Sequence, residues 1–305
     1  MDGNYSDVSD NRCSYHFTTG VFLTIANIIT TLLGTLSNVL IVVSVSRLHS
    51  LSNLFILNLS IADLLVCAAA LPLNSVWTVQ KTQGICLSQG FLYSRRVILS
   101  LSSSASLLIL SWVSIERFVV ISRPLRHKFY ITPRRTRIVL VITWTCSLMY
   151  GAVAAFDDNS FIAVFSTSVT VTCSVVVAAC YLNIFVIVWR QRRIQSELQR
   201  SQPQSQAIEK QVAKTMALVI SVFVLCFAPL TIARQTITKT FHGALHDGLL
   251  WLALSHSAVN PVIYFLRFKD YRTVLMRILH CKNIQEGYSR KSDNACMDNN
   301  QSELC

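Results

Sequence analysis

Long stretches without Asp, Glu, Lys or Arg recur along the chain. Six windows contain none of these residues: 17–46, 97–115, 138–156, 159–189, 215–233 and 248–266. A seventh window, 48–80, which is the second along the chain, contains only Asp63. Each window has at least about 19 residues, close to the ~20 that an α-helix needs to cross ~30 Å of hydrocarbon. Lipid offers the backbone no hydrogen-bond partners, and the sequence lacks the ~10-residue alternating segments of a β-barrel. The windows therefore predict seven transmembrane helices.

The fourth and fifth windows are separated only by Asp157 and Asp158. A single helix over 138–189 would be roughly 78 Å long, which is too long to cross a bilayer once. We therefore expect a hairpin around residues 157–160 that joins two separate membrane helices.

The composition agrees with a membrane protein. Hydrophobic residues make up 52% of the 305 positions and charged residues 14%, whereas soluble domains carry about 25% charged residues. This balance excludes a disordered chain, which needs low hydrophobicity. Ten cysteines in a chain of this length are too dilute for a small disulfide scaffold.

The basic residues predict the orientation of the chain in the membrane. If odd-numbered helices run inward, only six of the 27 Lys and Arg residues fall outside the cell: Arg12, Lys81, Arg95, Arg96, Arg234 and Lys239. The positive-inside rule then places the N-terminus of this multi-pass membrane protein outside and its C-terminus in the cytosol. The net charge of +12 faces the anionic inner leaflet, so it no longer supports nucleic-acid binding.

The chain divides accordingly into four parts. These are an extracellular tail (1–16), a transmembrane bundle (17–266), a short amphipathic eighth helix on the inner leaflet (267–281) and a cytoplasmic tail (282–305). Apolar residues at helical spacing among basic ones predict the amphipathic helix. Asn4 begins a glycosylation motif, and Cys281 is a candidate palmitoylation site.

Polar residues inside the windows are candidates for function. Asp63 lies near the middle of the second window, where a carboxylate costs at least ~2.5 kcal/mol on insertion scales and needs partners. Asn38, Ser106 and Asn260 lie at similar depths on other predicted helices. We therefore expect these four residues to form one polar cluster. It is either an ion or proton site coupled to a conformational change, or a set of hydrogen bonds that only packs the helices.

Two further features sit on the predicted helices. Pro229 and Pro261 interrupt the sixth and seventh windows, where each removes a backbone hydrogen bond and kinks its helix. Glu116 and Arg117 end the third span, and Glu209 precedes the sixth. Arg117 is either bonded to these carboxylates, so that its release frees the sixth helix, or an ordinary anchor at the membrane boundary.

Together these motifs resemble the rhodopsin-like (class A) family of G-protein-coupled receptors over about residues 17–281. Each motif is weak alone, and the ordered set is specific. The matching segments are Gly34–Val39, Asn58–Asp63, Glu116–Phe118, Trp144, Tyr181, Phe223, Cys226–Pro229 and Asn260–Tyr264. Cys173 in place of a helix-five proline and a very short second external loop are similar to the melanocortin, cannabinoid and lysophospholipid receptor branch.

The resemblance implies a receptor, not an enzyme, that passes the signal of an extracellular ligand to a heterotrimeric G protein. Arrestin and receptor kinases are further expected partners. In the inactive state Arg117 would be held by Glu116 and Glu209, and outward movement of helix six would open a cytoplasmic cavity. The residues implied in this switch are Glu116, Arg117, Tyr181, Glu209, Phe223, Phe227, Pro229, Asn260, Pro261 and Tyr264.

A sodium ion is the only cofactor that the resemblance implies. The residues that match the family's sodium-binding cluster are Asn38, Asp63, Ser106, Ser257 and Asn260. His256 stands where the family often has Asn, and Phe227 replaces the usual Trp. Both departures bear on sodium binding and on the usual movement of helix six.

The resemblance also restricts the ligand. Leu99 occupies the height at which amine receptors carry an Asp, and Leu254 the position of the retinal-binding Lys of opsins, which argues against both ligand types. Arginines at the outer helix ends favour an anionic lipid or a peptide, unless they only extend to the membrane interface. The ligand candidates are Arg95, Arg96, Leu99, Phe227 and Arg234.

The external cysteines and histidines depart from the family. The short second loop has no cysteine, so the family's usual disulfide has no counterpart, and only Cys13 and Cys86 face the outside. These two are either bridged to each other or free. His242 and His246, with Asp247 beside them, have zinc spacing if helical, but a third firm ligand is missing, so no firm metal site is expected.

Other function classes are weaker. An ion channel or transporter that uses Asp63 is the main alternative, although the sequence has no internal repeat of the transporter kind. Ion flux without nucleotide exchange on a G protein would favour it. The sequence contains no GxSxG, HExxH, GxGxxG or CxxC motif, which argues against an enzyme.

Overall fold

The computed structural model describes residues 16–46, 51–85, 87–123, 126–156, 160–197, 218, 221–233, 243–267 and 273. Every regular element in these ranges is a helix. The longest are α2 (Phe17–Val45), α5 (Gln89–Ser122), α7 (Pro133–Phe156), α8 (Ser160–Glu197) and α10 (Ala244–Arg267). A short helix, α6 (His127–Tyr130), lies between α5 and α7.

Each hydrophobic window corresponds to a helix. Six spans are long and apolar enough to cross a membrane, and the sixth window contributes a shorter apolar helix, Ser221–Ala233. The prediction of an all-α, seven-helix membrane bundle is therefore confirmed. Windows four and five form separate helices, since α7 ends at Phe156 and α8 begins at Ser160.

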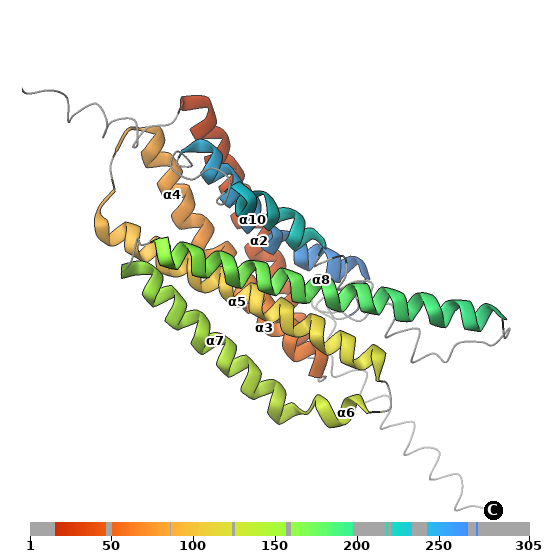
Figure 1. Cartoon of the computed structure of the whole chain (residues 1–305). Coiled ribbons are helices and arrows are strands. Elements are labelled where there is room, and N and C mark those ends of the chain that lie inside the picture. Colours follow the sequence, from red (N-terminus) through yellow and green to blue (C-terminus); the bar gives the residue numbers. More distant parts are fainter. Residues whose placement is uncertain are drawn as a thin grey trace, which may run out of the picture.

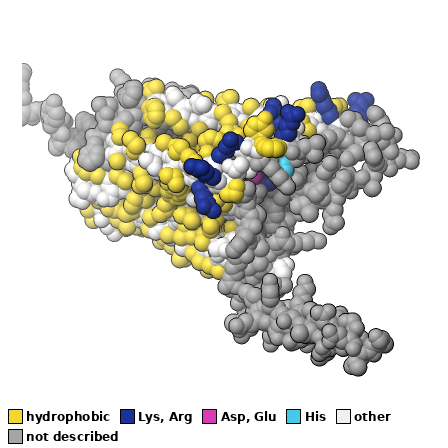
Figure 2. Space-filling model, turned by 90° about the horizontal axis from the view of Figure 1, so that it is seen from below, with side chains coloured by type: hydrophobic (Ala, Val, Ile, Leu, Met, Phe, Trp, Pro, Cys, Tyr) yellow, Lys and Arg dark blue, Asp and Glu magenta, His cyan; other side chains and the backbone are white. Residues whose placement is uncertain are grey.

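The outer surface of the bundle is strongly apolar. Leu182, Phe185 and Leu225 are 67%, 69% and 70% exposed, as expected of side chains that face lipid. Figure 2 shows that hydrophobic side chains cover most of the described surface on one face, with Lys and Arg side chains gathered toward one end. The exposed face is therefore suited to a bilayer and not to water.

The second span changes its winding halfway. It runs as α3 (Leu51–Leu65), a π-helical turn η1 (Val66–Ala70) and α4 (Leu71–Thr82). In the wide turn the backbone N–H of Leu71 donates to the carbonyl of Val66, five residues earlier. Pro72 follows directly, and the wide turn relieves the clash between its ring and the preceding turn. This irregularity was not predicted, although Pro72 was the visible signal.

α5 lies at the centre of the arrangement. It packs against α3, α7 and α8, while α2 packs against α3, α4 and α10 (Figure 1). One core cluster joins α3 and α5 to α10 and the Ser221–Ala233 helix through buried residues such as Leu59, Ile109, Tyr264 and Phe223. A second cluster, nearer the other end of α10, includes Val66, Leu71, Leu230 and Leu254.

Gly34 permits the close approach of α2 to the second span. A Cβ atom at this position would lie 2.4 Å from Sγ of Cys67 and 3.1 Å from Cβ of Ala258. We expect Gly34→Ala to lower the free energy of unfolding by about 1–3 kcal/mol, because overpacking forces neighbouring atoms apart. Thermal unfolding of the purified protein would measure this loss.

Gly90→Ala is the matched control for Gly34→Ala. Gly90, near the start of α5, has nothing within 4 Å of its added Cβ, so Gly90→Ala should leave the melting temperature nearly unchanged. The double variant Gly34→Ala, Cys67→Ala should recover part of the loss, since the nearest atom is removed. Equal melting temperatures for Gly34→Ala and Gly90→Ala would contradict the proposed contact.

Candidate functional site

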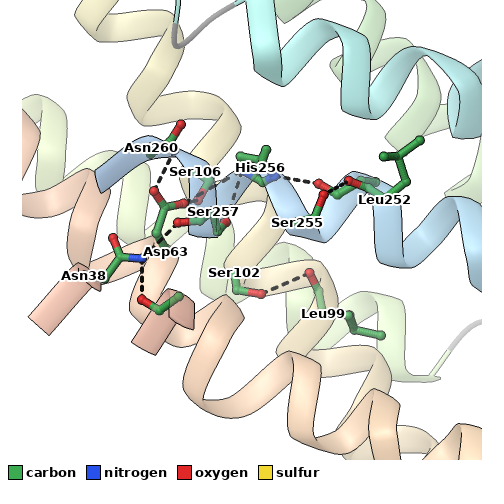
Figure 3. A network of polar contacts seen from close by, with 12 residues as sticks. Asn38, Asp63, Leu99, Ser102, Ser106, Leu252, Ser255, His256, Ser257 and Asn260 are labelled. Atoms are coloured by element: carbon green, nitrogen blue, oxygen red, sulfur yellow. Dashed lines mark hydrogen bonds and ion pairs between the residues drawn. The ribbon is translucent and has the colours of Figure 1, made fainter. Parts of the chain in front are cut away.

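Asp63 lies at the centre of a buried polar network (Figure 3). Its side chain is fully buried on α3. Oδ1 accepts hydrogen bonds from Oγ of Ser106 at 3.0 Å and from Oγ of Ser257 at 2.8 Å. Oδ2 accepts a hydrogen bond from Nδ2 of Asn260 at 2.7 Å. The carboxylate therefore ties α3 to α5 and α10 by three charge-assisted bonds.

Asn38 extends this network to α2 without bonding to the carboxylate itself. Its Nδ2 donates to the carbonyl oxygens of Gly34 and Ser257, each at 2.9 Å. The structure thus brings together the four residues that the sequence placed at one depth, together with Ser257. Four helices meet at this buried network.

His256 connects the Asp63 network to the Ser221–Ala233 helix. Nδ1 lies 2.6 Å from the carbonyl oxygen of Ala253, to which it must donate because that oxygen has no hydrogen. Nε2 lies 3.2 Å from Oγ of Ser257 and 3.8 Å from Oδ1 of Asp63. The rings of Phe223 and Phe227 stack on each other, with their centres 4.3 Å apart. Both rings contact the imidazole ring edge to face, with distances between ring centres of 5.0 and 5.2 Å. Movement of the Ser221–Ala233 helix must therefore disturb the neighbours of Asp63.

The donor set of this network suits a small hard cation. It offers a carboxylate, the hydroxyl oxygens of Ser106 and Ser257, and the side-chain oxygens of Asn38 and Asn260. Both amide oxygens are buried and accept no hydrogen bond from the described residues. Such oxygen atoms are the ligands that hard cations prefer, so the residues fit a sodium ion.

A buried ion pair marks one end of α5. Nε of Arg117 lies 2.9 Å from Oε2 of Glu116, and both residues are 5% exposed. Tyr264 is fully buried in the adjoining core, and Tyr181 on α8 packs against both that core and the cluster around Ile121. We call this the Arg117 end of the bundle.

The opposite end of the bundle holds a second buried carboxylate. Asp247, on the first turn of α10, is 2% exposed and accepts a hydrogen bond from Nε1 of Trp77 at 2.9 Å. Nζ of Lys81 lies 3.6 Å from its Oδ2, and a guanidinium nitrogen of Arg95 lies 3.8 Å from its Oδ1. Both cations also lie over the Trp77 ring, at 4.5 and 4.6 Å from its centre. This is the Asp247 end of the bundle.

Arg95 points into the bundle, where its side chain is buried. It donates to Oδ1 of Asn74 at 2.6 Å, and Nδ2 of Asn74 donates to Oδ1 of Asn27 at 3.1 Å. This chain of side chains joins α5, α4 and α2. Only Arg95 had been predicted as a functional residue here. Asn27 and Asn74, as polar residues inside membrane windows, were the signal for the rest.

The remaining predicted residues divide into two groups. Leu99 is partly buried against the second core cluster, and Arg96 is half-buried. Trp144 donates from Nε1 to Oδ1 of Asn58 at 3.0 Å and so links α7 to α3. The others lie outside the described residues: Asn4, Cys13, Cys86, Glu209, Arg234, His242, Cys281 and most of 267–281. In the described ranges no three His, Cys, Asp or Glu residues gather as a metal site.

Comparisons with known proteins agree with this architecture. The profile of the family described as 7 transmembrane receptor (rhodopsin family) matches residues 37–159 and 146–264. Trace amine-associated receptor 1 of Mus musculus is 25% identical, over 86% of this chain and 89% of that receptor. The histamine H2 receptor of Rattus norvegicus is 26% identical over 85% and 80%, respectively. The tachykinin-like peptides receptor 86C of Drosophila melanogaster is 24% identical over 77% and 53%. The chain belongs to the rhodopsin family of seven-transmembrane receptors.

Proposed function

We propose that a ligand at the Asp247 end of this receptor moves the Ser221–Ala233 helix outward and so admits a heterotrimeric G protein at the Arg117 end. Membership of the family makes the chain a membrane receptor that signals through a G protein. The observation that carries the proposed movement is the contact of Phe223 and Phe227 with His256, which continues to Asp63 through Ser257.

The proposed order of events during activation follows from these contacts. A ligand that contacts α10 above His256 changes the packing of the two phenylalanine rings. Because the rings belong to the Ser221–Ala233 helix, that helix pivots at Pro229, whose missing N–H weakens the helix there. The pivot opens space beside Arg117, which leaves Glu116 and contacts the G protein.

The proposed orientation follows the basic residues. The receptor lies in the plasma membrane with its Arg117 end facing the cytosol and its N-terminus outside the cell. Arrestin and receptor kinases would use the same cytosolic face. Glycosylation at Asn4 and palmitoylation at Cys281 stay predictions.

We propose a ligand that carries a negative charge. Several relatives are named as receptors for amines, which carry a positive charge. Here Leu99 lies among apolar residues, and Asp63 already accepts three hydrogen bonds. Asp247 is already flanked by Lys81 and Arg95. In the described spans, the two buried carboxylates outside the Arg117 end, those of Asp63 and Asp247, therefore already have partners. This disfavours recognition of an ammonium group.

Nucleotide exchange tests the proposed function. Membranes from cells that express the receptor are assayed for GTP loading of added G proteins while compounds are screened, and ion flux is recorded in parallel. We expect ligand-driven GTP loading without ion flux. Ligand-driven flux that persists with no loading of any G protein would support the channel alternative instead.

Sodium binding at Asp63 is a further part of this proposal. The oxygens of Asp63, Ser106 and Ser257 would hold the ion, whose charge would balance the carboxylate and stabilise the inactive packing. We expect sodium to weaken agonist binding to the unmodified receptor, and Asp63→Asn to remove most of this effect. Agonist affinity is measured in sodium chloride and in the chloride of a large organic cation. Equal affinity of the unmodified receptor in both salts would exclude the sodium site.

A further inference from the structure

Basic residues are concentrated where α7 enters the membrane. Residues 117–156 contain seven Lys or Arg residues and no Asp or Glu. Arg137 is the last charged residue before the charge-free window that begins at Ile138, so it marks the cytosolic boundary of the hydrocarbon. α6 packs against α5, and Figure 1 shows the start of α7 at the same end of the bundle. This stretch of the chain therefore lies at the height of the phosphates of the inner leaflet.

Arg134 and Arg137 lie on the side of α7 that faces lipid. Both are exposed, and so are Ile138, Val141 and Ile142 in the turns that follow. At about 100° per residue, these five positions fall on one face of the helix. The opposite face of α7 packs against α5. The apolar stripe that contacts the acyl chains therefore continues, on the cytosolic side, into two guanidinium groups.

A recess of 690 Å³ lies at the start of this stripe. The described residues that line it are Thr132, Pro133, Arg134, Arg137 and Ile138. A volume of this size lies within the ~300–1,000 Å³ of small-molecule sites. The lining changes from two guanidinium groups to an isoleucine on the membrane side. This order matches the join between the phosphate of a lipid and its acyl chains.

The donors of the two arginines are available to an external acceptor. Among the described residues, neither Arg134 nor Arg137 has a recorded hydrogen bond or ion pair. Arg135 differs, because it donates to the carbonyl oxygens of Phe129 and Tyr130 at 2.8 and 3.3 Å and so holds α6. A guanidinium presents five N–H donors in a planar fork that fits a phosphate group. Two such forks one helical turn apart can bind the same phosphate.

We propose that Arg134 and Arg137 bind the headgroup of an anionic lipid of the inner leaflet, whose acyl chains lie along Ile138, Val141 and Ile142. The lipid class is one whose headgroup carries a phosphomonoester. Such a group carries about 1.5 to 2 negative charges near pH 7, which balances two arginines. The phosphodiester of an ordinary phospholipid carries a single negative charge and offers fewer acceptor oxygens. The recess is thus a lipid site separate from the buried networks inside the bundle.

The test measures lipid binding to the purified full-length receptor in a neutral detergent, where no anionic leaflet attracts every basic residue. Phosphatidate, phosphatidylserine and phosphatidylglycerol with identical acyl chains are added in turn, and native mass spectrometry measures the fraction of receptor that carries each lipid. We expect phosphatidate to bind at least about tenfold more tightly than phosphatidylglycerol, as additional hydrogen bonds between charged groups imply. Glycerol 3-phosphate, the same headgroup without acyl chains, should not displace phosphatidate at equal concentration.

Variants then locate the site. Arg134→Gln and Arg137→Gln should each weaken phosphatidate binding about tenfold, and Lys at either position should weaken it less, because it keeps the charge but not the fork. Arg190→Gln is the matched control, since Arg190 is exposed at the end of the fifth window on α8. It should leave phosphatidate binding unchanged. The melting temperature without added lipid shows whether each variant folds.

Three results would overturn the inference. The first is equal binding of phosphatidate and phosphatidylglycerol to the unmodified receptor, which would show that the site does not recognise a phosphomonoester. The second is an equal loss in Arg190→Gln and in the two α7 variants, which would show a general effect of positive charge. The third is displacement by glycerol 3-phosphate at equal concentration, which would exclude a role for the acyl chains. Neither a receptor ligand nor a G protein takes part in this measurement, so its outcome is independent of the proposed function.

Discussion

Replacing Arg117 by alanine is expected to abolish ligand-driven nucleotide exchange while leaving most of the receptor on the cell surface. Arg117 is 5% exposed, and its recorded ion pair, with Glu116, joins neighbouring residues of one helix, so its loss breaks no ion pair between helices that is recorded for the described residues. The activated state needs the freed guanidinium to contact the G protein. Charge-assisted bonds of about 1.5–3 kcal/mol correspond to at least about a tenfold loss of coupling.

GTP loading normalised to surface expression measures this effect. Arg123→Ala is the matched control, because Arg123 caps the same helix but is exposed and pairs with Tyr130. It should retain most of the coupling. Glu116→Gln should act in the opposite direction and raise loading without ligand, since it weakens the bond that restrains Arg117. Coupling of Arg117→Ala at the unmodified level would contradict the role assigned to this residue.

Asp63→Ala is expected to give the largest loss of stability. The change leaves Ser106, Ser257 and Asn260 without their shared acceptor, and each orphaned buried donor costs about 1–3 kcal/mol. Asp63→Asn keeps one acceptor oxygen and should lose less. Melting temperatures of the purified variants in detergent would show the order unmodified, Asp63→Asn, Asp63→Ala, with a fall of several degrees for the last.

Serine variants provide the matched comparison on α5. Ser106 donates to Asp63, whereas Ser104 donates only to the carbonyl of Leu101 within its own helix in the recorded contacts. Ser106→Ala should therefore lower the melting temperature more than Ser104→Ala. If Asp63→Ala melts at or above the temperature of the unmodified receptor, desolvation of the carboxylate outweighs its bonds and the network does not stabilise the fold.

The sequence was sufficient to predict the membrane helices and to predict that Asp63 lies close to Ser106 and Asn260. Lipid excludes unpaired polar groups so strictly that a few polar residues at one depth must find one another. Helix lengths were less predictable. α8 continues to Glu197, past the end of its charge-free window at residue 189, because basic residues support a helix in water as well as apolar ones do.

The Asp247 end was mostly missed, for a different reason. Its residues come from four helices, and their approach depends on how far each helix is rotated about its own axis. Hydrophobic patterning reports this rotation poorly when a helix is apolar on all sides. His256 was recognised as a departure from the family, but its contact with Phe223 and Phe227 required the packing of two helices to be known.

The wide turn at Val66–Ala70 determines which side chains of the second span face inward beyond it. Each residue of an α-helix advances the helix by about 100°. One residue more or less in this turn would therefore turn Asn74, Trp77 and Lys81 toward other neighbours, although none of them had changed. A chain that lacked one residue of this turn could thus differ in chemical preference at the Asp247 end although Asn74, Trp77 and Lys81 were identical. A single-codon insertion or deletion in this turn, with no substitution at the Asp247 end, would be enough to cause that difference.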